Sequence, residues 1–242
     1  MPSFRVVTYN FLSGGSRQRS GHWPRVLRGL GADLVCAQEC RPPERVPTDD
    51  AVLWKSAGSR RWGSAIYARA ARLAPLEIPS HAGWVVGGEL EAAGWLGESR
   101  VRVFSIHGPA GRRGYIATMH EILDGLAPYR RGAELILAGD FNVAVGHRPP
   151  GDPLQLSRGE RAILDRLTGE FALISCWQTA HPGRRLAQTL RWSTNPATRY
   201  HCDGIFVPRA WSERLVACRV VRGARWQALS DHNPVAAEFA TA

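Results

Sequence analysis

Short apolar runs of strand length dominate this chain and constrain its fold more than any other feature. A half-buried strand needs only about four to eight residues, so runs of this length between turn residues are typical of β-structure. Many short strands bury their apolar faces best as two packed sheets with helices outside. We expect strands at 4–9, 34–37, 51–55, 63–68, 84–91, 101–106, 135–138, 172–176, 204–207, 215–221 and 235–239.

Three further segments carry apolar residues at helical spacing. One helix should begin at Trp23-Pro24 and end at Gly31, because proline suits the first turn of a helix and glycine its end. A second helix should span 115–126, and a third should run from about 157 to 168, after a capping-box pattern. The expected fold class is therefore α+β.

Length and composition indicate one ordinary globular unit. We expect a single domain over 1–242, since this length suits one large core. Hydrophobic residues make up 44%, and no apolar run approaches the roughly 18 residues that span a bilayer, so we expect no membrane span. No secretion signal opens the chain, and five scattered cysteines favour a reducing cytoplasm. Cys36 and Cys40 are four residues apart, but no second Cys/His pair at zinc-site spacing follows, so we do not expect them to bind zinc. For the oligomeric state, we favour a monomer.

The net charge of +10 and the pI near 10.2 fit a polyanionic partner such as nucleic acid. Arginine also suits phosphate, because its planar fork matches two oxygens. Only Lys55 among the 31 basic residues is a lysine, however, and so large an arginine excess also follows from codon bias. Charge alone therefore does not identify the partner.

Polar side chains stand at the ends of the expected strands. Asp140 and Asn142 are two apart after the run 135–138, so both leave the same face of its carboxyl end. A carboxylate can hold a metal or take a proton from water, an amide can donate to a phosphate oxygen, and a histidine can act near neutral pH. Each residue alone could equally be a turn former or a surface group. A two-sheet sandwich could gather the whole set at one rim: Asn10, Glu39, His107, Asp140, Asn142, Asp203, Asp231 and His232.

Six segments together resemble the successive motifs of the endonuclease/exonuclease/phosphatase superfamily, which has the deoxyribonuclease-like fold. They occur in the family's order and span almost the whole chain. The resemblance implies a four-layer α/β/β/α sandwich of two mixed sheets, with a Mg²⁺- or Mn²⁺-dependent phosphoesterase site at one rim. The segments are Thr8-Tyr9-Asn10, Ala37-Gln38-Glu39, Ser105-Ile106-His107-Gly108-Pro109, Gly139-Asp140-Phe141-Asn142, His201-Cys202-Asp203-Gly204-Ile205-Phe206 and Ser230-Asp231-His232-Asn233-Pro234.

The resemblance implies a metal role for three residues. Glu39 resembles the main metal ligand, and Asn10 beside it would help to hold metal or phosphate. Asp231 resembles a ligand of a second metal or of a metal-bound water. Mg²⁺ prefers a few hard oxygen ligands and keeps several waters, which fits this set.

The resemblance gives the other five residues catalytic roles. Asp140 resembles the group that positions or deprotonates the attacking water, and Asn142 the group that steadies the phosphate. His107 would donate to a phosphate oxygen. Asp203 resembles the partner of the catalytic His232, fixing its tautomer and favouring its charged form. The implied reaction is in-line attack of water at phosphorus.

The substrate is less constrained than the chemistry. Pancreatic-type deoxyribonucleases have an acidic residue where this chain has Trp62-Gly63, and AP endonucleases usually have tyrosine in place of His107. Gly204 stands where the family often has an aromatic residue, which should widen the site, and the loop 144–156 is a plausible specificity element. We expect nucleic acid as the substrate. A phosphatase or phosphodiesterase for a small or lipid phosphate, and a noncatalytic nucleic-acid-binding protein, are the alternatives.

Overall fold

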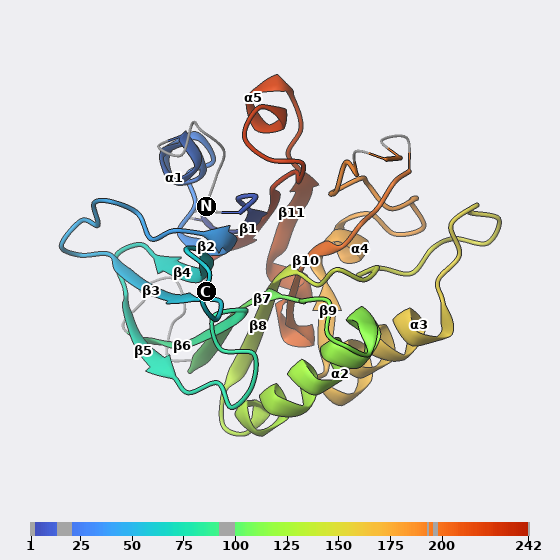
Figure 1. Cartoon of the computed structure of the whole chain (residues 1–242), viewed down its shortest axis with the longest axis horizontal. Coiled ribbons are helices and arrows are strands. Elements are labelled where there is room, and N and C mark those ends of the chain that lie inside the picture. The colour runs from blue at the N-terminus through green and yellow to red at the C-terminus, as the bar shows by residue number, and fades with distance from the viewer. Residues whose placement is uncertain (1–2, 14–20, 92–99, 193, 196–197, 242) are drawn as a thin grey trace.

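The computed structural model describes residues 3–13, 21–91, 100–192, 194–195 and 198–241. Two six-stranded sheets pack face to face, and helices cover their outer faces, as the predicted α/β/β/α sandwich requires (Figure 1). Both sheets are mixed, because each contains one parallel pair among antiparallel neighbours. The predicted fold class is confirmed.

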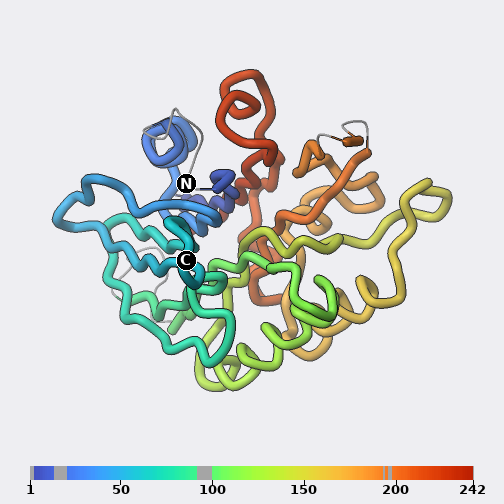
Figure 2. Tube along the Cα trace, viewed as in Figure 1, coloured from blue at the N-terminus to red at the C-terminus, as the bar shows by residue number. Residues whose placement is uncertain are grey.

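The first sheet joins the two ends of the described chain. β1 lies between β2, which runs parallel to it, and β12, which runs antiparallel (Figure 2). The strands in spatial order are β11 (Leu215–Val220), β12 (Val235–Ala240), β1 (Ser3–Asn10), β2 (Leu34–Cys40), β4 (Gly63–Ala68) and β3 (Ala51–Ser56).

The second sheet has a parallel pair, β7 and β8, at its centre. β10 then runs antiparallel to β8, so the start of β10 lies beside the end of β8. The strands in spatial order are β5 (Arg72–Leu76), β6 (Val85–Glu91), β7 (Val101–His107), β8 (Glu134–Asp140), β10 (Asp203–Pro208) and β9 (Leu173–Ser175).

Apolar side chains fill the space between the sheets, with Val6, Leu34 and Ile66 of the first meeting Val103 and Ile136 of the second. Each of these side chains is fully removed from solvent. Burying a side chain of this size contributes about 1.5–3 kcal/mol, so this layer is the main source of cohesion between the sheets.

The long helices cover the second sheet. α2 (Gly114–Leu126), α3 (Arg158–Asp165) and the π-helical turn η4 (Arg166–Glu170) pack against it through Met119, Leu123 and Ile163. Ser157 and Glu160 form the predicted capping box at the start of α3. None of the described helices is both long and apolar enough to cross a membrane.

Shorter helical segments complete the outer layers. α1 (His22–Pro24) and the π-helical turn η2 (Arg25–Gly29) cover the first sheet through Trp23 and Val26, and Gly31 then takes a φ of 60°. The remaining segments are η3 (Ala127–Arg130), α4 (Cys176–Ala180), η5 (Arg209–Arg214) and α5 (Ala224–Gln227).

Sequence periodicity located most elements but missed β5, α4 and α5. Pro75 lies inside β5, and a proline argues against a strand unless that strand is at an edge, which β5 is. α4 and α5 are one turn long, too short for a helical repeat to show.

Candidate active site

Strand pairing explains why the predicted residues meet. β7 and β8 run parallel and in register, so His107 and Asp140 lie side by side at their carboxyl ends. β10 runs the other way, which places Asp203 at its start directly opposite Asp140. From the first sheet, Asn10 ends β1, and Glu39 lies near the end of the parallel strand β2. One rim of the sandwich therefore collects carboxylate, amide and imidazole groups from both sheets.

Asp140 is the centre of this cluster and is 1% exposed. Its Oδ2 accepts hydrogen bonds from Asn10 Nδ2 at 3.0 Å and from Asn142 Nδ2 at 3.3 Å, and its Oδ1 accepts from the Asn142 backbone N–H at 3.0 Å. Gly139 lets β8 approach β7 here, because a Cβ at this position would lie 1.8 Å from the carbonyl oxygen of Ile106. The carboxylate is therefore held in one orientation.

Asn142 turns the chain away from the strand with a φ of 53°, a left-handed conformation that asparagine tolerates better than most residues. Its Nδ2 also donates to the carbonyl oxygen of Gly108 at 2.9 Å. The side chain is thus fixed between the loop after β7 and the Asp140 carboxylate.

Glu39 lies across from Asp140 on an irregular stretch of β2. Its φ is 46°, and the pairing of β2 with β4 shifts register between Ala37 and Cys40. Glu39 Oε1 lies 3.3 Å from Asn10 Nδ2 and 3.6 Å from His107 Nε2, while Oε2 accepts from the Ser13 hydroxyl at 2.9 Å. The bulge turns this carboxylate toward the shared cluster.

His232 and Asp203 form a buried pair. Both carboxylate oxygens of Asp203 lie within hydrogen-bonding distance of His232 Nδ1, at 3.0 and 2.9 Å, and His232 Nε2 faces Asp140 Oδ2 at 3.7 Å. Burial disfavours the imidazolium, but the charges of Asp203 and Asp140 and the hydrogen bond that His232 Nδ1 donates to Asp203 outweigh it and raise the pKa of His232 to about 10. The arrangement therefore favours a cationic His232 at neutral pH.

His107 has a different environment. Trp62 and Trp84 flank its ring at centroid distances of 5.8 and 5.0 Å, and Arg60 lies over both indoles. Among the described residues its Nδ1 has no hydrogen-bond partner, although it is buried. Burial lowers the pKa of His107, against the opposing charges of Asp140 and Glu39. Trp62 thus packs on the ring at the position where the pancreatic-type enzymes place a carboxylate.

Asp231 is only partly buried, with 41% of its side chain accessible. Its Oδ1 lies 3.9 Å from His232 Nε2, so it stands at the open side of the cluster. Its backbone carbonyl accepts from the Arg191 N–H at 2.9 Å.

Three supporting residues were missed from the sequence. The Ser230 hydroxyl donates to the Asn10 carbonyl oxygen at 2.8 Å, and Thr189 Oγ1 accepts the Asp203 N–H at 3.2 Å. The Arg191 guanidinium donates to the Ser230 carbonyl and the Asn233 side chain. Ser230 opens the last motif, which is the one signal in the sequence that could have indicated its role.

Gly204 does not widen the site as expected. A Cβ there would lie 2.9 Å from Val145 Cγ2 and 3.1 Å from Phe206 Cε2. The side chain of Val145 therefore occupies the space that we expected to be open, and that prediction is wrong.

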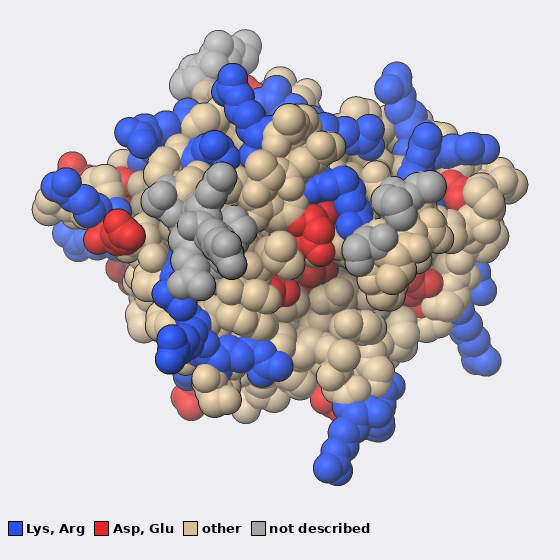
Figure 3. All heavy atoms as spheres, turned by 45° about the horizontal axis from the view of Figure 1, so that its top comes forward, with Lys and Arg blue, Asp and Glu red and all other residues tan. Residues whose placement is uncertain are grey.

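The donor set suits a hard divalent cation. The carboxylates of Glu39 and Asp140 converge on the Asn10 amide and on His107 Nε2, and in the part of the chain that the structure describes neither forms an ion pair with Lys or Arg. The Asn10 oxygen itself accepts from the Leu12 N–H at 2.9 Å, so Asn10 here orients the two carboxylates. Acidic side chains gather near the centre of the face in Figure 3, with Lys and Arg on several sides of them.

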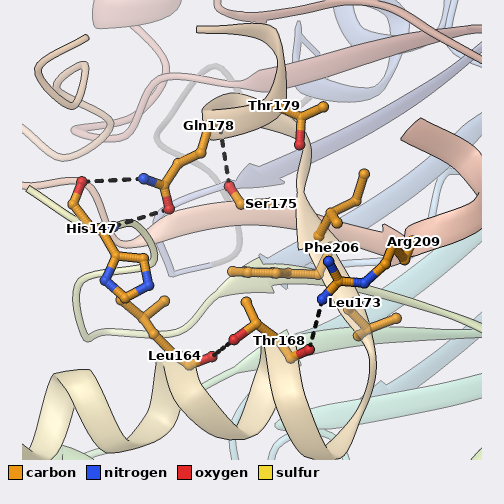
Figure 4. Close-up of a pocket in the computed structure, with 10 residues that line it drawn as sticks. His147, Leu164, Thr168, Leu173, Ser175, Gln178, Thr179, Phe206 and Arg209 are labelled. Atoms are coloured by element: carbon orange, nitrogen blue, oxygen red, sulfur yellow. Dashed lines mark hydrogen bonds between the residues drawn. The ribbon is translucent and has the colours of Figure 1, made fainter. Parts of the chain in front are cut away.

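Two hollows lie apart from the cluster, and none of the predicted site residues lines either. One, of about 370 Å³, lies between α3 and α4, where Gln178 bonds both backbone groups of His147 and Arg209 donates to the Thr168 carbonyl (Figure 4). The other, of about 1150 Å³, lies between η2 and the proline-rich loop 41–48. In the loop 144–156, the Arg148 side chain is 6% exposed and pairs with Asp152 at 3.4 Å, which leaves His147 as the more accessible basic residue of the loop.

Known structures share this fold across the whole chain. An AP endonuclease from Archaeoglobus fulgidus is 19% identical, with a TM-score of 0.71 and coverage of 98% of this chain and 99% of its own. An AP endonuclease from Leishmania major is 15% identical, with a TM-score of 0.73 and coverage of 99% and 88%. The 3′ phosphatase NExo from Neisseria, bound to a product DNA hairpin, is 18% identical, with a TM-score of 0.68 and coverage of 98% and 99%.

No curated protein is significantly similar in sequence to this chain. The sequence profile of the endonuclease/exonuclease/phosphatase family, by contrast, matches residues 7–232, which include every predicted site residue. The chain belongs to the endonuclease/exonuclease/phosphatase family.

Proposed function

We propose that this protein is a divalent-metal-dependent phosphodiesterase that cleaves nucleic acid by in-line attack of water. The observation that carries the proposal is the position of Asp140, which faces Asn10, Asn142 and His232 from three sides at one rim. A proton acceptor, phosphate donors and a cationic imidazole are the groups that this reaction needs. A noncatalytic nucleic-acid-binding protein, the alternative, would not require these reactive groups to converge.

Asp140 takes the proton of the attacking water in this scheme, because its carboxylate is buried, fixed and directed at the shared space. The amide of Asn142 and His107 Nε2 hold oxygens of the phosphate. His232, kept cationic by Asp203, stabilises the negative charge that builds up on the pentacoordinate phosphorus.

Mg²⁺ or Mn²⁺ would be held by Glu39, with Asn10 orienting that carboxylate and Asp231 available at the open side. When bound, such an ion supplies Lewis acidity toward the phosphate oxygens. These hard oxygen groups pair with no arginine or lysine among the described residues, which supports this assignment.

Nucleic acid is the proposed substrate because the chain carries a net charge of +10. Proteins with the same fold include the Neisseria 3′ phosphatase bound to a product DNA hairpin, which is consistent with this choice. A cytoplasmic location is also proposed, since all five cysteines are free and buried.

The test is hydrolysis of plasmid DNA, single-stranded DNA and RNA with Mg²⁺ or Mn²⁺, with EDTA as the metal-free control. We expect cleavage by the wild type and a loss of at least about 100-fold in Asp140→Asn and His232→Ala. Asp152→Asn is a matched control, because Asp152 is a buried carboxylate paired outside the cluster. Hydrolysis of an inositol phosphate, a lipid phosphodiester or a 3′ phosphomonoester in preference to internal diester bonds would overturn the nucleic-acid diesterase assignment.

A further inference from the structure

A buried thiol adjoins the catalytic cluster. Cys202 Sγ lies 3.6 Å from Asp203 Oδ2 and 4.0 Å from Thr189 Oγ1, and the residue is 5% exposed. The cluster therefore contains sulfur as well as oxygen and nitrogen donors. One ligand atom from each of Asp140, Cys202, Asp203 and His232 lies within 4.8 Å of the others.

These four side chains offer sulfur, nitrogen and oxygen ligands, whereas Glu39 offers oxygen alone. Mg²⁺ takes oxygen ligands, whereas a thiolate, an imidazole and carboxylates in a tetrahedron are typical of Zn²⁺. With Zn–S near 2.3 Å and Zn–N or Zn–O near 2.0 Å, ligand atoms around one tetrahedral ion lie about 3.3–3.8 Å apart. The four side chains therefore need to draw together by only about 1 Å to enclose an ion.

We propose that Zn²⁺ binds between Cys202, Asp203, Asp140 and His232 and inhibits the enzyme. The binding site follows from the donor atoms alone, while the inhibition rests on the proposed function. A zinc ion held there would occupy Asp140 and His232 together, so it would remove both the proton acceptor and the charge stabiliser. The proposed Mg²⁺ ligand Glu39 is not part of this set.

The ligand set also balances the charge of the cation. Zn²⁺ would meet three anionic ligands, the Cys202 thiolate and the carboxylates of Asp140 and Asp203, together with the neutral imidazole of His232. Cysteine and histidine bind metals in their deprotonated forms, so protons on these two side chains would pass to solvent on binding.

Cobalt substitution tests the site without any substrate. Co²⁺ bound to a thiolate shows a sulfur-to-metal charge-transfer band in the near ultraviolet and strong visible bands in tetrahedral geometry. We expect these bands in the wild type, their loss in Cys202→Ala and Cys202→Ser, and their retention in Cys218→Ala, which removes a buried thiol from β11. Thermal melts establish that each variant is folded.

Zinc affinity and inhibition complete the test. By calorimetry, Zn²⁺ should bind both Cys202 variants at least about tenfold more weakly than the wild type. In Mg²⁺, Zn²⁺ should inhibit the wild type and Cys218→Ala, but inhibit Cys202→Ala at least about tenfold less, each relative to its own zinc-free rate. Absence of the cobalt bands from the wild type, or equal zinc affinity in folded Cys202→Ala, would refute the site. If the protein hydrolyses no substrate, the proposed function fails, and the cobalt spectra still decide the zinc site.

Discussion

Replacing Asp203 with asparagine should change how hydrolysis depends on pH. Asp203 lies 2.9 Å from His232 Nδ1, and both groups are buried. Two unit charges about 3 Å apart attract by about 5 kcal/mol at an effective dielectric constant of about 20. Burial would lower the pKa of His232, and this attraction, with the smaller one to Asp140, raises it to about 10. Without it, the pKa of His232 should fall to about 6.5 or below.

The loss of activity follows from the protonated fraction. With a pKa of about 6.5, only about 3% of His232 is cationic at pH 8, against most of it at pH 6. The ratio of kcat/KM between wild type and Asp203→Asn should therefore be about 25-fold larger at pH 8 than at pH 6. The assay is hydrolysis of bis-4-nitrophenyl phosphate at saturating Mg²⁺, together with an NMR titration of the His232 imidazole.

Asp231→Asn is the matched control. Its carboxylate is partly exposed and lies 3.9 Å from His232 Nε2, so it contributes less to the pKa of His232 than Asp203 does. Whatever its absolute rate, this variant should keep the wild-type pH profile. A wild-type to Asp203→Asn ratio that stays constant between pH 6 and pH 8, with an unshifted imidazole titration, would refute the reasoning.

Three further predictions concern metal dependence, backbone fit and acid stability. Glu39→Gln should raise the Mg²⁺ concentration for half-maximal activity by about tenfold or more, measured by metal titration of the rate, because it removes the charge of the proposed ligand. Gly139→Ala should lower the free energy of unfolding by more than about 2 kcal/mol in urea melts, since its Cβ would lie 1.8 Å from the Ile106 carbonyl oxygen, whereas Gly29→Ala, with no atom within 4 Å of its Cβ, should not. Burial lowers the pKa of His201 to about 4, so the stability present above pH 6.5 should fall by about 3 kcal/mol as the pH drops from 6.5 to 4, and His201→Gln should remove most of this dependence in urea melts. An unchanged metal titration, equal unfolding of the two glycine variants, or an unaltered pH slope would each contradict the corresponding prediction.

The sequence predicted the fold well, because strand length and helical spacing are local properties. It could not predict which strands are neighbours. The register that places His107 beside Asp140, and Asp203 opposite it, comes from the order of strands in the second sheet. Only the resemblance to the family, through the order of its motifs, indicated that these residues come together.

Contacts between side chains of distant segments could not be predicted from the sequence. Trp62 reads as an ordinary aromatic residue before a strand, and only the pairing of sheets shows that it packs on His107. The expectation for Gly204 failed for the same reason, because Val145, which fills that space, belongs to another segment. Local pattern therefore identified the reactive groups, while tertiary packing determined their surroundings.

The pairing of β1 with both β2 and β12 has a consequence for biosynthesis. β1 is made before the other described strands, yet its antiparallel partner, β12, follows more than two hundred residues later. His232 lies three residues before the start of this late strand, and Asp203 opens β10. Neither residue of the charged pair has been made when the first motifs leave the ribosome. A phosphoesterase arranged in this way should remain inactive throughout its own translation, because its reactive cluster closes only with β12.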